Sequence, residues 1–97
     1  MIAYRTTWLV KPNCMQKALD LLTAGRVELG DHVVRIYTPR ISPNLLVFEM
    51  TSASVQEHDK WWAAYNATPE AAVAFKKWDE LVERRVGDEV WDVTEFR

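Results

Sequence analysis

The most constraining feature of this sequence is the segment 45–50, which is apolar on nearly all of both faces of a strand. Successive side chains of a strand point to opposite faces, so a strand without alternation must be covered on two sides. The preceding segment 40–44 contains Pro43 and Asn44 and is too short for anything but an antiparallel return. The chain has too few helices to cover both sides of a sheet. We therefore expect a second, identical subunit to cover one side.

The rest of the chain predicts a β-α-β-β-α-β order of elements. The strands are expected at 2–10, 32–38, 45–50 and 89–96, where β-branched and aromatic residues are frequent. Asn13, with Gln16 three residues later, predicts the start of the first helix, and Gly25 or Gly30 predicts its end. The second helical block is predicted to open at two N-terminal caps and to end near residues 87–88. These caps are Ser54, paired with Glu57, and Thr68, followed by Pro69.

These elements fit one α+β domain that covers residues 1–97. Right-handed crossovers would place both helical blocks on one face of a four-stranded antiparallel sheet. The first and third strands would then lie at its centre. The other face would meet its counterpart in a twofold homodimer, which would remove an exposed apolar sheet from water.

Composition argues for a soluble cytoplasmic protein without nucleic-acid or membrane partners. The net charge is −2, and the 12 basic and 14 acidic residues are scattered, so no basic stripe is available to neutralise phosphates. Cys14 is the single cysteine, which is expected in a reducing compartment. The start of the chain lacks the pattern of a signal peptide, and no apolar stretch is long enough to span a membrane.

Three segments resemble a known superfamily. The step from the first strand to the first helix, Trp8-Leu9-Val10-Lys11-Pro12-Asn13, is similar to a "VKPG" motif. The other two segments are Thr68-Pro69-Glu70 with Phe75, Trp78 and Leu81, and the closing Asp88-Glu89-Val90-Trp91. All three resemble the dimeric α/β-barrel (ferredoxin-like) superfamily, near its NIPSNAP-like and antibiotic-biosynthesis-monooxygenase-like groups. The resemblance covers essentially the whole chain and implies a ferredoxin-like fold and a dimeric barrel. It specifies the function poorly, because one fold carries many sites.

The haem-degrading branch of that superfamily is a poor match. The resemblance places Arg5 or Thr6 where that branch has an asparagine, and Trp78 where it has a histidine. Without that histidine, haem degradation is not expected. The two histidines and one cysteine match no metal-ligand spacing, and the chain has no glycine-rich phosphate loop. We therefore predict no metal and no cofactor.

The aromatic residues of the helical segments are the strongest candidates for a ligand site. Trp62, Tyr65 and Trp78 could line an apolar slot between helices and sheet that suits a flat aromatic molecule. The alternative is that they fill the core, as aromatic stripes on helices usually do. Adjacent helical positions point about 100° apart, so we expect Trp62 to pack inward and Trp61 to lie on the flank.

His58 and Arg35 are the weaker, catalytic candidates. His58 could act alone as an acid or base at the mouth of the slot, or it could be an ordinary helix histidine. Arg5 and Arg35 could bind an oxyanion if they share the helix-facing side of the sheet. On the other side they would pair with Glu49 or Glu95 across the dimer, which is the interpretation we prefer.

Three functional hypotheses follow from these residues. The first is a homodimer that binds a small apolar or aromatic molecule in the helix–sheet cleft. The second is a cofactor-independent monooxygenase, in which Trp62, Tyr65 and Trp78 position a phenolic ring and His58 or Arg35 assists its deprotonation. The third is a purely structural dimer, with side chains filling the cleft.

Overall fold

A computed structural model of the chain describes residues 1–25, 32–41 and 44–96. The described elements, in chain order, are β1 (Ile2–Val10), α1 (Met15–Ala24), β2 (Val34–Tyr37), β3 (Leu45–Ser52), α2 (Val55–Asn66), α3 (Pro69–Leu81) and β4 (Val82–Asp92). The predicted β-α-β-β-α-β order is therefore confirmed, with the second helical block divided into α2 and α3.

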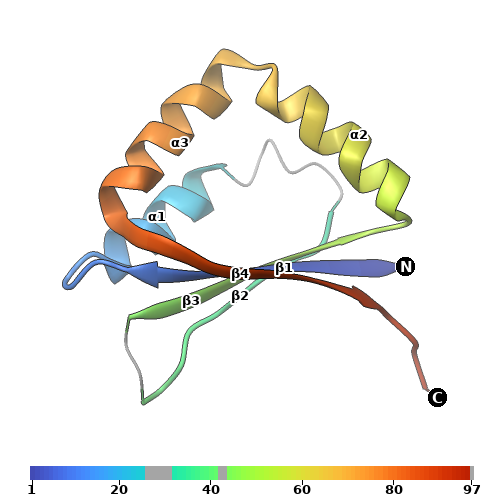
Figure 1. Cartoon of the computed structure of the whole chain (residues 1–97), viewed down its shortest axis with the longest axis horizontal. Helices are drawn as coiled ribbons and strands as arrows, with labels where there is room; N and C mark the ends of the chain where they lie inside the picture. Colours follow the sequence, from blue (N-terminus) through green and yellow to red (C-terminus); the bar gives the residue numbers. More distant parts are fainter. Residues whose placement is uncertain (26–31, 42–43, 97) are drawn as a thin grey trace.

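The four strands form one antiparallel sheet in the order β2-β3-β1-β4. β1 and β3 are central, as the sequence predicts. The three described helices lie over the same face of the sheet, and no helix of the described residues lies on the opposite face (Figure 1). The α+β, ferredoxin-like fold is thus confirmed. Within the described residues the sheet is open at β2 and at β4, so the chain does not close a barrel by itself.

Strand pairing assigns every side chain of the sheet to one of two faces. Tyr4 pairs with Met50, and Trp8 pairs with Leu46, and these residues point toward the helices. We call this side the helix-facing side. Odd-numbered residues of β1, β2 and β3 point away from the helices, and we call that side the open face. Arg5 and its partner Glu49 lie on the open face.

The core lies between α1, α3 and the half of the sheet near the end of β1. Trp78 of α3 is 8% exposed and meets the Trp8 ring edge-on, with ring centres 5.6 Å apart. The other fully enclosed residues of this cluster are Val10, Ala18, Leu46 and Val82. Apolar contacts of this kind supply most of the stability of a small domain.

The two caps predicted for the second helical block are confirmed. The Ser54 hydroxyl accepts a hydrogen bond from the Glu57 amide at 3.2 Å. The Thr68 hydroxyl accepts one from the Ala71 amide at 3.3 Å, and Pro69 occupies the first turn of α3. Each cap satisfies a backbone amide that the helix itself leaves unpaired.

The predicted start of α1 is wrong in one detail. Asn13 does not cap the helix, because its φ of 64° places it in the left-handed region. Cys14 is the N-cap and makes no side-chain capping bond, and the Gln16 amide donates to Asp20 within the helix. α1 ends at Gly25, as one of the two alternatives predicts, whereas Gly30 lies outside the described residues.

The boundaries of β2, β3 and β4 differ from the prediction. β4 begins at Val82, directly after α3, so the helix ends well before residues 87–88 and the strand does not extend to residue 96. β2 is shorter than predicted, and β3 continues to Ser52. Residues 42–43 of the predicted turn at 40–44 lie outside the described residues.

Candidate functional site

Helix α2 is the aromatic-rich element of the fold, yet none of its residues is fully buried. Trp62 is 44% exposed, whereas Trp61 and Tyr65 are partly buried. The Trp61 and Tyr65 rings are nearly parallel, with centres 5.4 Å apart. Trp62 and Tyr65 both also meet Phe75 of α3 edge-on. We call these four residues, Trp61, Trp62, Tyr65 and Phe75, the aromatic surface. It connects α2 with α3 and lies outside the core around Trp78.

His58 lies at the inner end of the aromatic surface of α2. Its ring stacks on Tyr4 of β1, with centres 3.6 Å apart and planes within 14°. The Nδ1 atom is buried and has no hydrogen-bond partner among the described residues. Burial lowers the pKa of His58, the charge of Asp59 acts to raise it, and His32 acts to lower it. The net lowering favours the neutral imidazole, which can accept or donate one proton.

His32 approaches the same group of rings from the segment before β2. Its Nδ1 atom lies 2.9 Å from the carbonyl oxygen of Thr51 and 3.3 Å from the Ser52 hydroxyl. A carbonyl oxygen only accepts, so the short contact requires the Nδ1–H group to donate. The His32 ring also meets Trp61 at 5.4 Å. The sequence did not predict the contacts of His32 with Thr51 and Ser52, because these two residues belong to another strand.

An open apolar groove of about 360 Å³ lies between the end of α1 and the start of α3, next to Tyr65. Its lining residues are Leu21, Ala24, Gly25, Tyr65, Pro69, Glu70, Val73, Ala74 and Lys77. The volume is in the range of small-molecule sites. Ring contacts run from Tyr65 at the groove to Trp61, and from Trp61 to His58. The groove and the imidazole of His58 therefore lie at the two ends of one series of ring contacts.

The structure brings together two of the three residues predicted to line a slot. The rings of Trp62 and Tyr65 are 6.2 Å apart. Trp78 belongs to the enclosed core and packs on Trp8, so its position matches the alternative in which it fills the core. Tyr65 is the member of the trio that lines the groove. Binding of a ligand by these residues stays a prediction.

The expected orientation of the tryptophan pair is reversed. Trp61 turns inward to contact His32 and His58, while Trp62 is the more exposed ring of the two. Both residues are spaced from His58 and Tyr65 by three or four positions, so helical periodicity alone favours neither. Trp61 contacts His32, which precedes β2, and local sequence spacing does not predict that contact.

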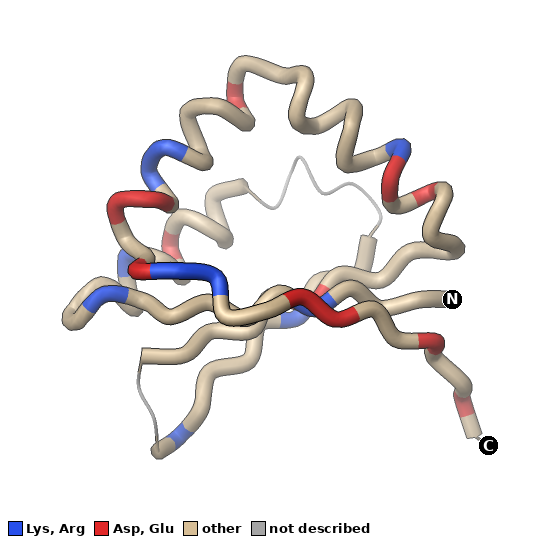
Figure 2. Tube along the Cα trace, in the orientation of Figure 1, with Lys and Arg blue, Asp and Glu red and all other residues tan. Residues whose placement is uncertain are grey.

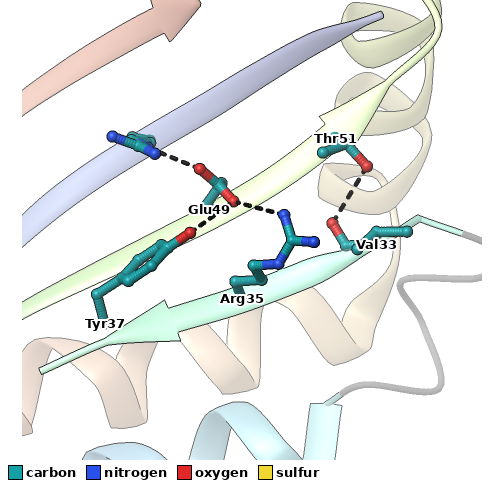
Figure 3. Close-up of polar contacts among 6 residues, drawn as sticks. Val33, Arg35, Tyr37, Glu49 and Thr51 are labelled. Atoms are coloured by element: carbon teal, nitrogen blue, oxygen red, sulfur yellow. Dashed lines mark hydrogen bonds and ion pairs between the residues drawn. The ribbon is translucent and has the colours of Figure 1, made fainter. Parts of the chain in front are cut away.

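Arg35 lies on the open face, away from His58. The carboxylate of Glu49 receives the Arg5 Nε at 2.7 Å and the Tyr37 hydroxyl at 3.1 Å, and the Arg35 guanidinium lies 3.5 Å from it (Figure 3). The preferred pairing of both arginines with Glu49 is therefore found, but within one chain. Arg35 does not reach the helix-facing side, so the structure does not place it beside a ring bound near His58.

Glu49 is 3% exposed although it lies on the open face, because Arg5, Arg35 and Tyr37 cover it. Burial acts to raise the pKa of this carboxyl. The hydrogen bonds from Arg5 and Tyr37 and the charge of Arg5 outweigh burial, so the pKa is lowered below its usual value. Glu49 is therefore an anion held by two cations in the middle of the sheet.

The described residues contain no cluster of histidine, cysteine and acidic side chains that could hold a metal ion. Cys14 is a free, partly buried thiol at the start of α1. Among the residues that the structure describes, no helix is long and apolar enough to cross a membrane. Basic and acidic residues are both spread over several elements (Figure 2).

Comparison with known proteins identifies the fold. The chain matches no protein-family model and no curated protein. Among solved structures it is similar to an uncharacterised NIPSNAP domain protein from Burkholderia xenovorans, with 12% identity, a TM-score of 0.85, and coverage of 100% of this chain and 98% of that chain. A NIPSNAP-family protein of unknown function from Agrobacterium tumefaciens has 18% identity, a TM-score of 0.82, and coverage of 100% and 91%.

A third similar structure, from Chloroflexus aurantiacus, is a candidate antibiotic biosynthesis monooxygenase. It has 9% identity and a TM-score of 0.77, and the alignment covers 99% of this chain and 95% of that chain. Identities this low establish the arrangement of the backbone and leave activity open. The resemblance expected from the sequence is therefore confirmed for the fold: this chain has the ferredoxin-like fold seen in NIPSNAP-family and antibiotic-monooxygenase-like structures.

Proposed function

We propose that this protein is a homodimer that binds a small, flat apolar or aromatic molecule in the groove beside Tyr65. The observation that carries the ligand proposal is the groove itself, about 360 Å³ in volume and lined mainly by apolar side chains. The ring of Tyr65 lines the groove, and the ring of Trp61 stacks on Tyr65. Offset stacking on such rings favours flat ligands.

The open face supports the homodimer part of the proposal. It carries the apolar side chains of Leu9, Leu45 and Val47, together with Tyr37 and Trp91, which are 42% and 49% exposed. The helices of the described residues all cover the other face (Figure 1). A second copy of the same face would remove these side chains from water, which is the usual route to a twofold dimer.

Binding in the groove can be tested with 1-naphthol as a probe and a matched pair of variants. Val73 lines the groove and is 56% exposed, so Val73→Trp should fill the groove without disturbing the core. Val55 is 41% exposed at the start of α2 and does not line the groove, so Val55→Trp is the control. We expect 1-naphthol to shift the amide NMR signals of Ala24, Gly25 and Ala74, and Val73→Trp to weaken binding at least tenfold.

The control variant should bind 1-naphthol as the original chain does. Absence of shifts up to the solubility of the probe would refute the groove as a ligand site. Equal weakening by both valine substitutions would refute it as well. Either outcome would favour the purely structural dimer.

A cofactor-independent monooxygenase is the second candidate function, favoured by the partly buried imidazole of His58, whose Nδ1 atom is buried and whose lowered pKa favours the neutral form. A neutral imidazole can take the proton of an acidic ring CH₂ group and leave an electron-rich carbanion. The overall reaction would convert that CH₂ group and O₂ into a ring carbonyl and water. The substrate supplies all the electrons, so no reductant is required.

Oxygen consumption with anthrone tests this second function. We expect turnover to fall at least a hundredfold in His58→Phe, which keeps a flat ring against Tyr4 but removes the base. Trp62→Ala should also reduce turnover without unfolding the chain if Trp62 positions the substrate. Oxygen uptake no faster than the reaction without protein would eliminate the monooxygenase candidate and leave the binding proposal intact.

A further inference from the structure

The open face carries a row of charges that alternates in sign across all four strands. Arg35 of β2 pairs with Glu49 of β3, Glu49 pairs with Arg5 of β1, and Arg5 pairs with Glu89 of β4. Paired residues of neighbouring strands point to the same face. From one edge of the sheet to the other, the row therefore reads positive, negative, positive, negative. The acidic stretch of β4 is visible at mid-sheet in Figure 2.

This row becomes complementary to itself when its direction is reversed. A twofold axis parallel to the strands, between β1 and β3, would place the row of one subunit against the reversed row of the other. Arg35 would then face Glu89 of the partner subunit, and Arg5 would face Glu49 of the partner subunit. An axis along the row would instead place each charge against the same charge, which costs free energy.

In the neighbouring row of the sheet, the shapes of the side chains at the two ends are also complementary when the row is reversed. It contains Tyr37 of β2, Val47 of β3, Thr7 of β1 and Gly87 of β4. Tyr37 is the bulkiest side chain at one end, and 42% of it is exposed. At the other end, a Cβ atom added to Gly87 would meet nothing within 4 Å in the single chain. Reversal places the large ring of one subunit over the empty position of the other.

We infer that the charge row fixes the orientation of the homodimer, with β2 of one subunit facing β4 of the other. This inference rests on the homodimer part of the proposed function. The central Arg5 and Glu49 of both subunits would form a closed set of four charges with no net charge. Such buried charges contribute more to the choice of orientation than to affinity, because their desolvation offsets much of their attraction.

Two single charge reversals provide the test. In a homodimer of the Arg35→Glu variant, the new carboxylate of each subunit would face Glu89 of the partner subunit. In a homodimer of the Glu89→Arg variant, each new guanidinium would face Arg35 of the partner subunit. Each variant should therefore raise the dimer dissociation constant at least tenfold, as measured by sedimentation of the full chain at low salt. Circular dichroism should show that both variants fold, because Arg35 and Glu89 are exposed.

Mixing the two variants in equal amounts should restore association. In the mixed dimer, one of the two contacts is the original pair and the other is the same pair with its charges exchanged, so both contacts join opposite charges. The dissociation constant of the mixed dimer should lie within about threefold of that of the original chain. Gly87→Phe should weaken the original dimer through a clash with Tyr37 of the partner subunit, without affecting the fold of the monomer.

Each other result has a distinct meaning. If the original chain stays monomeric at millimolar concentration, the homodimer itself is refuted, and this orientation with it. If the original chain dimerises but the single reversals do not weaken it, or if mixing does not restore association, the orientation is wrong while the homodimer stands. A mixed dimer that forms only at high salt would likewise overturn the charge-row argument.

Discussion

The two halves of the helix layer are built differently. On the α1–α3 side, Trp78 and Ala71 of α3 are buried, and the core cluster encloses Val10 and Leu46 of the sheet. On the α2 side no helix residue is fully buried, although α2 contains three large aromatic rings. The contrast shows that aromatic content does not by itself mark a core. It separates a half that holds the fold together from a half whose rings stay partly exposed, with Tyr65 among the residues that line the groove.

The largest effect that can separate these halves is the loss of one tryptophan from each. Trp78→Ala removes a buried ring and should lower the free energy of unfolding by about 3–5 kcal/mol, a large part of the stability of a small domain. Trp62→Ala removes a ring that is 44% exposed and should cost about 1 kcal/mol, mainly its contacts with Tyr65 and Phe75. Urea unfolding at a fixed protein concentration measures both.

If the two substitutions lowered the free energy of unfolding by the same amount, the distinction between the two halves would be wrong. Fixed concentration is needed because association stabilises the folded chain by mass action. If Trp62→Ala unfolded the chain, the aromatic surface of α2 would be part of the core, and its proposed contribution to ligand binding would lose its basis.

The sequence predicted the topology and the caps of the second helical block better than it predicted the start of α1 and the end of α3. The strand order, the central position of β1 and β3, and the caps at Ser54 and Thr68 follow from local patterns and from topology rules. The end of α3 was misplaced because residues 82–86 place three charged residues between two valines, so they lack the alternation typical of a strand. Pairing with β1 makes them a strand, and that partner is far away in the sequence.

The candidate site was harder to predict because long-range contacts define it. Helical spacing allows either Trp61 or Trp62 to turn inward, and Trp61 is the one that contacts His32, a residue far away in the sequence. The position of Trp78 in the core depends on Trp8, a residue 70 positions earlier in the chain. Local spacing places side chains on a face of an element, but it does not identify what that face meets.

An intermediate effect is expected from removing the two helix caps. Ser54→Ala and Thr68→Ala each remove one cap bond, typically worth about 1 kcal/mol. The Thr68 hydroxyl also donates to the Tyr65 carbonyl at 2.7 Å and so ties the end of α2 to α3. Thr68→Ala should therefore lower the global free energy of unfolding by the larger amount, and Ser54→Ala should mainly speed amide hydrogen exchange within α2.

Amide exchange measured residue by residue distinguishes these responses. If Ser54→Ala speeds amide hydrogen exchange only within α2, this helix opens separately from the rest of the fold. Exchange that rises equally in α2 and around Trp78 would contradict it, because the two halves would then unfold as one unit.

The smallest expected effect is a pH dependence that comes from the α2 side alone. Because burial lowers the pKa of His58 in the folded chain, the unfolded chain binds the proton first as the pH falls. The contribution of His58 is therefore present above about pH 6.5, decreases as the pH falls below that value, and is fully lost below the folded pKa. The lowered pKa of Glu49 acts in a separate window, with stability lost as the pH falls below its unfolded value of 4.5.

Melting temperatures measured between pH 7 and pH 5 isolate the contribution of His58. We expect the melting temperature of the original chain to fall over this range, and His58→Phe to reduce that fall. The effect should be small because the histidine is only partly buried, so water screens its charge. An identical slope in His58→Phe would show that the imidazole is not held neutral by its position against Tyr4, and the difference between the two halves would then rest on packing alone.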